Sequence, residues 1–315
     1  MIEEIINNIC METFNALPSF TQRNHVGIAA YVYTIVVNEE KYVLKLSENE
    51  ELISGSTYWL IRLQSLELPI PKIIAMNTKT NPFYLIMSFI PGQDLGVVYN
   101  TLSSEQKKKI SYELFQYQNT LRKLPAAKGY GFLHSYEDEQ NSKKSWKEVV
   151  ESHIKRSEKR IEENGIFSMD YINRVKYFIP FFSGYFDAIK PEPFFDDTTT
   201  KNVLVDQGIL SGIIDLDWIC FGDRLYVIAL TTMSLLNMHA DLEYVEHWKD
   251  LEKLSGIQGK VLLFYVLVFC IDFMAEKGMK FNKPAQVQVK HEEKILLEHI
   301  FDQYFENLQL TLAST

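Results

Sequence analysis

Three polar residues in one short stretch of the chain have the types and the order that phosphoryl transfer requires. Asp197 and Asn202 stand in the pattern D-x-x-x-x-N, and Asp215 follows 13 residues after Asn202. A carboxylate at Asp197 could take up the proton of an attacking hydroxyl. An amide and a second carboxylate offer the hard oxygen atoms that Mg²⁺ prefers. A base followed by two metal ligands is the arrangement that a kinase active site needs.

A predicted β-hairpin would bring the two metal ligands together. The apolar runs Val203-Leu-Val and Leu210–Ile214 stand on either side of Gly208, and two such runs around a glycine turn are typical of antiparallel strands. Asn202 and Asp215 are then at the same end of the hairpin. We therefore expect their side chains to lie close together.

A lysine interrupts an apolar strand in the N-terminal part of the chain. The runs Tyr31–Val37 and Lys41–Leu46 are rich in β-branched and aromatic residues and surround a polar turn, which predicts another hairpin. On this hairpin, Lys45 is expected to point into a cleft and pair with nucleotide phosphates. The alternative is an exposed lysine on an edge strand. Gly27 precedes the first strand, where a small residue would let backbone N–H groups approach phosphates.

The rest of the chain divides into a small β-rich part and a larger helical part. We predict an amphipathic helix at the start, a helix over residues 51–66, and strands at Ile73–Met76 and Phe83–Ile90. Ser103 opens a capping-box pattern, S-x-x-Q, that ends at Gln106. Further helices are expected around residues 145–163, 170–188, 225–238, 258–277 and 286–309. The predicted boundary is a hinge at residues 88–92, between a nucleotide-binding lobe (1–90) and a helical lobe (91–315) that holds the catalytic loop and the acceptor site.

The composition is that of an acidic globular protein. The 315 residues include 41 acidic and 32 basic ones, which give a net charge of −9, so a basic face for nucleic acid is not expected. The longest apolar run, Val261–Ile271, stops at Asp272, well short of the roughly 20 residues that a membrane helix needs. The acidic start of the chain and three unpatterned cysteines, Cys10, Cys220 and Cys270, favour a cytoplasmic protein with reduced thiols.

Four segments together resemble the aminoglycoside phosphotransferase family. They are Lys45, Met87-Ser-Phe-Ile-Pro-Gly, Asp197–Asn202 and Ile213-Ile-Asp-Leu-Asp-Trp, and the resemblance extends over nearly the whole chain. It implies an α+β, protein-kinase-like fold of two lobes: a small antiparallel sheet with one main helix, followed by a larger, mostly helical lobe. It also implies ATP or GTP and Mg²⁺ as cofactors.

The resemblance assigns a role to each matching residue. Asp197 becomes the catalytic base, and Asn202 and Asp215 become the Mg²⁺ ligands, to which Asp217 would add a carboxylate. Lys45 becomes the lysine that pairs with the phosphates. The nucleotide-binding residues that the resemblance adds are Ser88 and Ile90, whose backbone groups would hold the adenine, and Met87 behind it.

Three positions depart from the family pattern. Phe195 stands where the family usually has a histidine, two residues before the base, and Val227 replaces an acid after Gly222-Asp223. The third departure concerns the glutamate that usually pairs with the strand lysine, because Ser56 stands near its place and Glu51 lies more than a turn earlier. Either Glu51 reaches Lys45 through a shifted helix, or Lys45 lacks its usual partner.

The combined prediction is an ATP-dependent phosphotransferase that acts on a hydroxyl of a small molecule. One alternative is a kinase of another metabolite, such as an amino alcohol or a sugar, and another is a nucleotide-binding protein with little transferase activity. Acidic clusters at residues 137–139 and 241–250 suit either the pocket of a polycationic aminoglycoside or a solvated surface. A protein-kinase role is less favoured, because Gly222-Asp223 follows Asp215 too closely for an activation segment.

Overall fold

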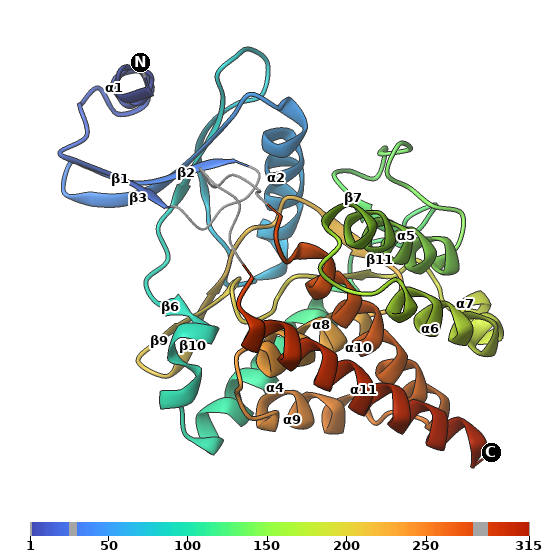
Figure 1. The fold of residues 1–315 in the computed structure, drawn as a ribbon. Coiled ribbons are helices and arrows are strands. Elements are labelled where there is room, and N and C mark those ends of the chain that lie inside the picture. The colour runs from blue at the N-terminus through green and yellow to red at the C-terminus, as the bar shows by residue number, and fades with distance from the viewer. Residues whose placement is uncertain (1, 25–29, 280–288, 315) are drawn as a thin grey trace.

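The N-terminal part of the structure is a five-stranded antiparallel sheet (Figure 1). This computed structural model describes residues 2–24, 30–279 and 289–314. The strand order is β1-β2-β3-β5-β4, and the predicted hairpin is formed by β2 and β3. The strands are β1 (Phe20–Asn24), β2 (Tyr31–Val37), β3 (Glu40–Ser47), β4 (Ile73–Asn77) and β5 (Phe83–Ser88).

Two helices cover opposite faces of this sheet (Figure 1). Helix α1 (Ile2–Phe14) packs on the face that carries Leu44 and Leu46 of β3. Helix α2 (Glu50–Leu63) lies on the other face, where Lys45 reaches it. Because side chains alternate along a strand, the apolar residues of β3 can face one helix while its lysine faces the other. The lysine therefore does not interrupt the apolar layer beneath α1.

The larger part of the chain is a helical body with one continuous apolar core. Its helices are α3 (Leu95–Val98), α4 (Ser104–Leu121), α5 (Trp146–Asn164), α6 (Asp170–Phe178), α7 (Ser183–Ala188), α8 (Leu225–Asn237), α9 (Glu243–Glu252), α10 (Gly256–Glu276) and α11 (His291–Ala313). The capping box predicted at Ser103 is present at the start of α4, with both reciprocal hydrogen bonds formed. An antiparallel sheet followed by a mostly helical part confirms the predicted α+β class.

The helix predicted over residues 170–188 is divided in two. A 3₁₀ segment, Ile179–Phe182, separates α6 from α7 and contains Pro180. Proline lacks a backbone N–H and its ring clashes with the preceding turn, so a continuous α-helix is disfavoured at this point. The apolar spacing continues across the break, which is why the sequence pattern did not reveal it.

Helix α10 is the central helix of the body. By length and composition alone it could cross a membrane, but 67% of its most apolar window is buried inside the protein. Asp272, which ends the apolar run in the sequence, accepts hydrogen bonds from Arg156 and Ser157 of α5. A buried carboxylate is stable only when it is paired. Asp272 thus joins two core helices.

Two small three-stranded sheets lie in the helical part, with orders β10-β9-β6 and β7-β11-β8. The hairpin predicted before Asp215 is formed by β9 and β10. It is fastened to the segment after β5, because Ser211 Oγ donates a hydrogen bond to the Pro91 carbonyl at 2.6 Å. The strands are β6 (Gln93–Asp94), β7 (Gly131–Leu133), β8 (Pro193–Phe194), β9 (Val203–Asp206), β10 (Ile209–Ile213) and β11 (Ile219–Phe221).

Candidate active site

The loop between β8 and β9 holds the predicted base and the predicted amide ligand together. Asn202 Nδ2 donates hydrogen bonds to the backbone carbonyl and to Oδ2 of Asp197, each at 2.9 Å. Thr199 Oγ1 donates to the other carboxylate oxygen of Asp197 at 3.3 Å. With its nitrogen turned toward Asp197, the Asn202 side chain directs its oxygen away from the base.

A buried glutamine of α4 anchors this loop. Gln118 Nε2 donates to the Phe195 carbonyl at 2.9 Å, and Gln118 Oε1 accepts from the Phe195 N–H at 3.0 Å. Phe195, which replaces the family's histidine, is itself buried. The backbone of the loop is therefore fixed without a histidine. Gln118 was not predicted, although its place on the apolar face of α4, between Leu114 and Leu121, was a usable signal.

Asp215 follows β10 at the end of the hairpin, next to Asn202. The Ile214 N–H donates to the Asn202 carbonyl at 3.0 Å, which joins the two predicted metal ligands through the backbone. Asp215 has a left-handed backbone with φ of 62°. Aspartate tolerates this region better than most residues, and such conformations concentrate at functional sites. Its side chain is 55% exposed and available to a ligand.

Lys45 lies buried between the sheet and the segment that follows β10. Its Nζ forms a close ion pair with Asp217 Oδ1 and lies 3.2 Å from Asp215 Oδ1. Burial disfavours the charge of the lysine, but the carboxylates of Asp217 and Asp215 outweigh this effect and raise the pKa of Lys45 above its ordinary value. The lysine is therefore a permanent cation, and it meets acidic residues from the distant end of the chain.

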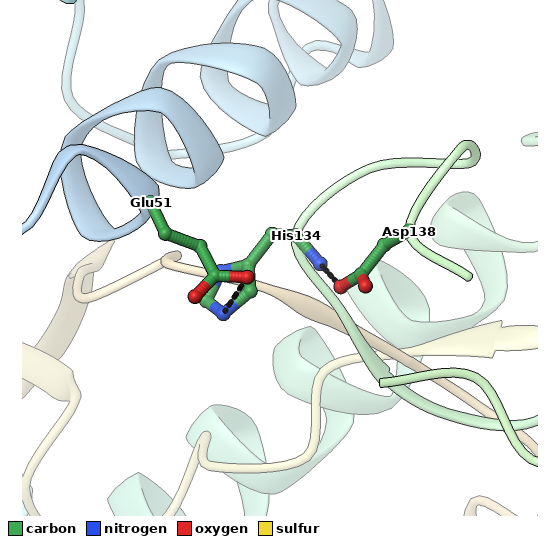
Figure 2. A group of neighbouring side chains, drawn as sticks. All are labelled: Glu51, His134 and Asp138. Atoms are coloured by element: carbon green, nitrogen blue, oxygen red, sulfur yellow. Dashed lines mark hydrogen bonds and ion pairs between the residues drawn. The ribbon is translucent and has the colours of Figure 1, made fainter. Parts of the chain in front are cut away.

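The partner of Lys45 on helix α2 is a hydroxyl. Ser56 Oγ lies 3.4 Å from Lys45 Nζ and makes a short hydrogen bond to Asp217 Oδ1. Glu51, the other residue considered for this role, extends from α2 toward His134 instead (Figure 2), with 4.0 Å between Oε1 and Nε2. Among the described residues, the carboxylates within ion-pair distance of Lys45 are therefore those of Asp215 and Asp217.

Glu51, His134 and Asp138 form a contact between α2 and the loop after β7 (Figure 2). Their possible ligand atoms lie within 4.8 Å of one another. Both carboxylate oxygens of Asp138, however, already accept hydrogen bonds from Asn141, and one also accepts from the His134 N–H at 3.0 Å. His134 Nδ1 donates to the Asp217 carbonyl, also at 3.0 Å. These groups bind one another and hold α2 beside Asp217.

Loss of hydration and neighbouring charges shift the pKa values of both adjacent aspartates of the loop. Loss of hydration, followed by repulsion from Asp215, raises the pKa of Asp197 to about 6. Burial and repulsion from Asp197 raise the pKa of Asp196 to about 8, so Asp196 is largely protonated at neutral pH. Trp218 Nε1 donates to both oxygens of Asp196 at 3.1 Å. Asp197 alone of the two is ionised near pH 7, as a base must be.

The predicted adenine-binding residues lie at the end of β5 and in the segment that follows it. Met87 of β5 pairs with Val43 of β3. Val43 is two residues before Lys45, so Met87 lies on the same face of the sheet as Lys45. Ser88 ends β5 and its N–H donates to the Lys72 carbonyl at 2.8 Å. The side chain of Ile90 packs against Gly212 of β10, where a Cβ atom would lie 2.7 Å from Ile90 Cγ2. Gly27 lies outside the described residues.

The two acidic clusters are engaged in contacts within the protein. Asp241 binds Lys107 Nζ at 2.7 Å, and Glu137 accepts a hydrogen bond from the Tyr58 hydroxyl at 2.9 Å. The departure at Val227 is also accommodated, because Val227 is fully buried in the core. These positions contribute to packing and to contacts between helices.

Comparisons with known proteins identify the family and the fold of this chain. A sequence model of the phosphotransferase enzyme family matches residues 21–256. A thermostable mutant of aminoglycoside phosphotransferase APH(4)-Ia, in ternary complex with AMP-PNP and hygromycin B, is similar in structure: its TM-score is 0.68 at 16% identity, covering 98% of this chain and 99% of that chain. At this identity the similarity establishes the fold alone. A search of curated proteins found no match.

Two further solved structures have the same fold. The streptomycin–ATP–APH(2")-IIa ternary complex has a TM-score of 0.65 at 15% identity and covers 96% of both chains. A putative fructosamine-3-kinase from Haemophilus somnus 129PT has a TM-score of 0.64 at 13% identity, covering 95% of this chain and 96% of that chain. The fold predicted from the resemblance is thus confirmed, and the family model spans β1 to the start of α10. This chain is an enzyme that belongs to the phosphotransferase enzyme family.

Proposed function

We propose that this protein transfers the γ-phosphate of ATP to a hydroxyl group of a small molecule. The observation that carries the proposal is the meeting of Lys45, from the N-terminal sheet, with the segment that contains Asp215. Asp215 in turn adjoins Asn202 and Asp197 through the hairpin. A cation for phosphates, two oxygen ligands and a base form one group, which suits phosphoryl transfer.

The base in this proposal is Asp197. Its carboxylate would accept a hydrogen bond from the acceptor hydroxyl and take up the proton as the new P–O bond forms. Asn202 and Thr199 hold the carboxylate through hydrogen bonds, so it meets the hydroxyl in a defined orientation. Such positioning supplies much of the rate enhancement in phosphoryl transfer.

Lys45 is proposed to bind the phosphates of the nucleotide. Its ammonium group is pre-charged and fixed by two carboxylates, so little reorganisation is needed when the nucleotide binds. The adenine is expected near the segment of Ser88 and Ile90, with Met87 behind it. The related structures that contain AMP-PNP or ATP support nucleotide binding by this fold.

Asn202 and Asp215 fit a Mg²⁺ ion. Both offer oxygen atoms, they are neighbours in space, and the Asp215 side chain is largely exposed. When bound, the ion would supply neutralisation of the phosphate charge. The protein's own part is to hold the two side chains, through the β9–β10 hairpin and through the hydrogen bond from Asn202 to Asp197.

The acceptor is proposed to be a small-molecule alcohol. The structural relatives include complexes with hygromycin B and streptomycin, and also a putative fructosamine-3-kinase, so aminoglycosides and sugar derivatives are the first candidates. Amino alcohols form a third group to test. A nucleotide-binding protein with little turnover is the competing function.

The test combines nucleotide binding with a screen of acceptors. Thermal shift with ATP and Mg²⁺ measures binding, and an assay of ATP consumption over aminoglycosides, sugars and amino alcohols measures transfer. Asp197→Asn is the matched control, because it removes the base and leaves Lys45 in place. Consumption of ATP that needs both an acceptor and Asp197 is the expected result. Binding without turnover on every acceptor would favour the competing function.

A further inference from the structure

We propose that Asp217, supported by Ser56, positions Lys45 for the nucleotide phosphates and does not bind the metal. This inference rests on the proposed function, because it concerns the same site. The fixed counter-ion of Lys45 is then Asp217, in the segment after β10. Helix α2 contributes only a hydroxyl group to this pair.

The two carboxylates beside Lys45 differ sharply in exposure. The Asp217 side chain is 7% exposed and the Lys45 side chain 6%, whereas that of Asp215 is 55% exposed. A buried ion pair that loses one member leaves an uncompensated charge in the interior, which is strongly unfavourable. Asp217 is therefore the structural partner of the lysine, and Asp215 is the one free to turn toward a ligand.

The remaining contacts of Asp217 fix it in this position. Its Oδ1 accepts hydrogen bonds from Lys45 Nζ and from the hydroxyl of Ser56. Its backbone carbonyl accepts from His134 Nδ1 at 3.0 Å. A Cβ atom on Gly55 of α2 would lie only 2.5 Å from that carbonyl, so the helix approaches Asp217 as closely as glycine permits. A carboxylate that already binds a cation and is packed beneath a helix is poorly placed to bind Mg²⁺.

This arrangement divides the work between two acidic residues. When Asp215 is engaged with the metal, Lys45 loses part of its second ion pair but keeps Asp217. The lysine then stays charged and directed at the phosphates throughout the reaction. Asp217 is thus a positioning residue, which acts on the nucleotide through Lys45.

The experiment compares four proteins by calorimetric titration. They are the wild type, Asp217→Asn, the exchange variant S56D/D217S, which moves the carboxylate from one side of Lys45 to the other, and the control Glu51→Gln. The control removes a charge from α2 that does not contact Lys45. Each is titrated with AMP-PNP in Mg²⁺, with AMP-PNP in EDTA, and with adenosine.

We expect Asp217→Asn to weaken AMP-PNP binding about tenfold or more in both Mg²⁺ and EDTA, since a charge-assisted contact to the phosphates is disturbed. Adenosine has no phosphates, so its affinity should stay within about twofold of the wild type. The exchange variant should recover most of the AMP-PNP affinity, and Glu51→Gln should match the wild type. A merely structural role would weaken adenosine and AMP-PNP alike.

Several results would overturn the inference. Loss of affinity in Mg²⁺ but not in EDTA would assign Asp217 to the metal, and unchanged binding would remove it from the site. If Asp217→Asn fails to fold, the exchange variant decides: a folded exchange variant with weak AMP-PNP binding contradicts the proposal. A wild-type protein that binds no nucleotide would overturn the proposed function as well. Failure of the proposed function is thus seen in the wild type, whereas failure of the Asp217 inference alone is seen only in the variants.

Discussion

Asn202 and Asp197 are joined by two hydrogen bonds that share one donor atom. Nδ2 of Asn202 donates to the backbone carbonyl and to the carboxylate of Asp197, each at 2.9 Å. The amide thus orients the proposed base with its nitrogen and directs its oxygen away from it, where the oxygen could serve as the proposed metal ligand. One residue connects the two halves of the proposed chemistry, proton removal and phosphate neutralisation.

Replacement of Asp197 by asparagine tests the proposed removal of a proton. Asp197→Asn should lower kcat by about 10²–10⁴-fold, because the amide cannot take the proton of the acceptor hydroxyl. The dissociation constant for AMP-PNP should stay within about threefold of the wild type, since Lys45 and Asp215 are untouched. Steady-state kinetics and calorimetric titration measure the two quantities. Activity close to that of the wild type would exclude Asp197 as the base.

The pH profile offers an independent test of the same residue. Loss of hydration and the charge of Asp215 raise the pKa of Asp197 to about 6, and only the ionised carboxylate can act as a base. The quantity kcat/KM for ATP, which reports on the free enzyme, should therefore fall as the pH drops through about 6. Asp197→Asn should abolish this limb in any residual activity. A limb that remains near pH 6 in the variant would come from another group.

Asp196 should make the stability of the fold depend on pH. Its pKa is about 8 in the folded protein, well above that of a free carboxyl, so the folded state holds a proton that the unfolded state releases. The wild type should lose stability as the pH rises from about 4 through 8. Asp196→Asn does not titrate and keeps an oxygen for the Trp218 N–H. When the pH is raised from 5 to 8.5, the Tm of Asp196→Asn should rise relative to that of the wild type by about 2–4 °C. An unchanged difference would contradict the raised pKa.

Two helical glycines allow a matched test of how closely α2 must approach Asp217. A methyl group at Gly55 would lie 2.5 Å from the Asp217 carbonyl and 2.6 Å from His134 Nδ1, whereas at Gly259 of α10 it would meet nothing within 4 Å. Gly55→Ala should cost about 1–3 kcal/mol of unfolding free energy through overpacking and weaken AMP-PNP binding. Gly259→Ala should be neutral or stabilising by up to about 1 kcal/mol. Urea unfolding and calorimetric titration measure both, and equal effects at the two positions would contradict the close approach.

Local patterns in the sequence predicted most of the secondary structure. Alternating and β-branched residues identified the β2–β3 hairpin, and the capping box at Ser103 marked the start of α4. The same S-x-x-Q pattern recurs at Ser255, where the capping box of α10 was not recognised. The very short strands β6, β8 and β11 carry too few residues for any periodicity and were not predicted.

The site was predictable where its residues are linked through one hairpin. The pairing of β9 with β10 brings Asn202 next to Asp215, and spacing alone conveys this. The partner of Lys45 was not predictable, because Asp217 is 172 residues away in the chain. Their contact depends on how closely α2 packs against the segment that contains Asp217. Gly55 and Ser56 set this distance through contacts that form only in the folded protein.

The ion pair across the two parts of the molecule has a consequence for protein engineering. Lys45 belongs to the sheet and Asp217 to the segment after β10, so neither part alone neutralises its own buried charge. A chimera that grafts residues 1–90 onto the remainder of another family member would inherit the cation without its anion, unless that remainder carries an acid at the equivalent of Asp217. Recombination between residues 90 and 91 must therefore exchange the two residues together.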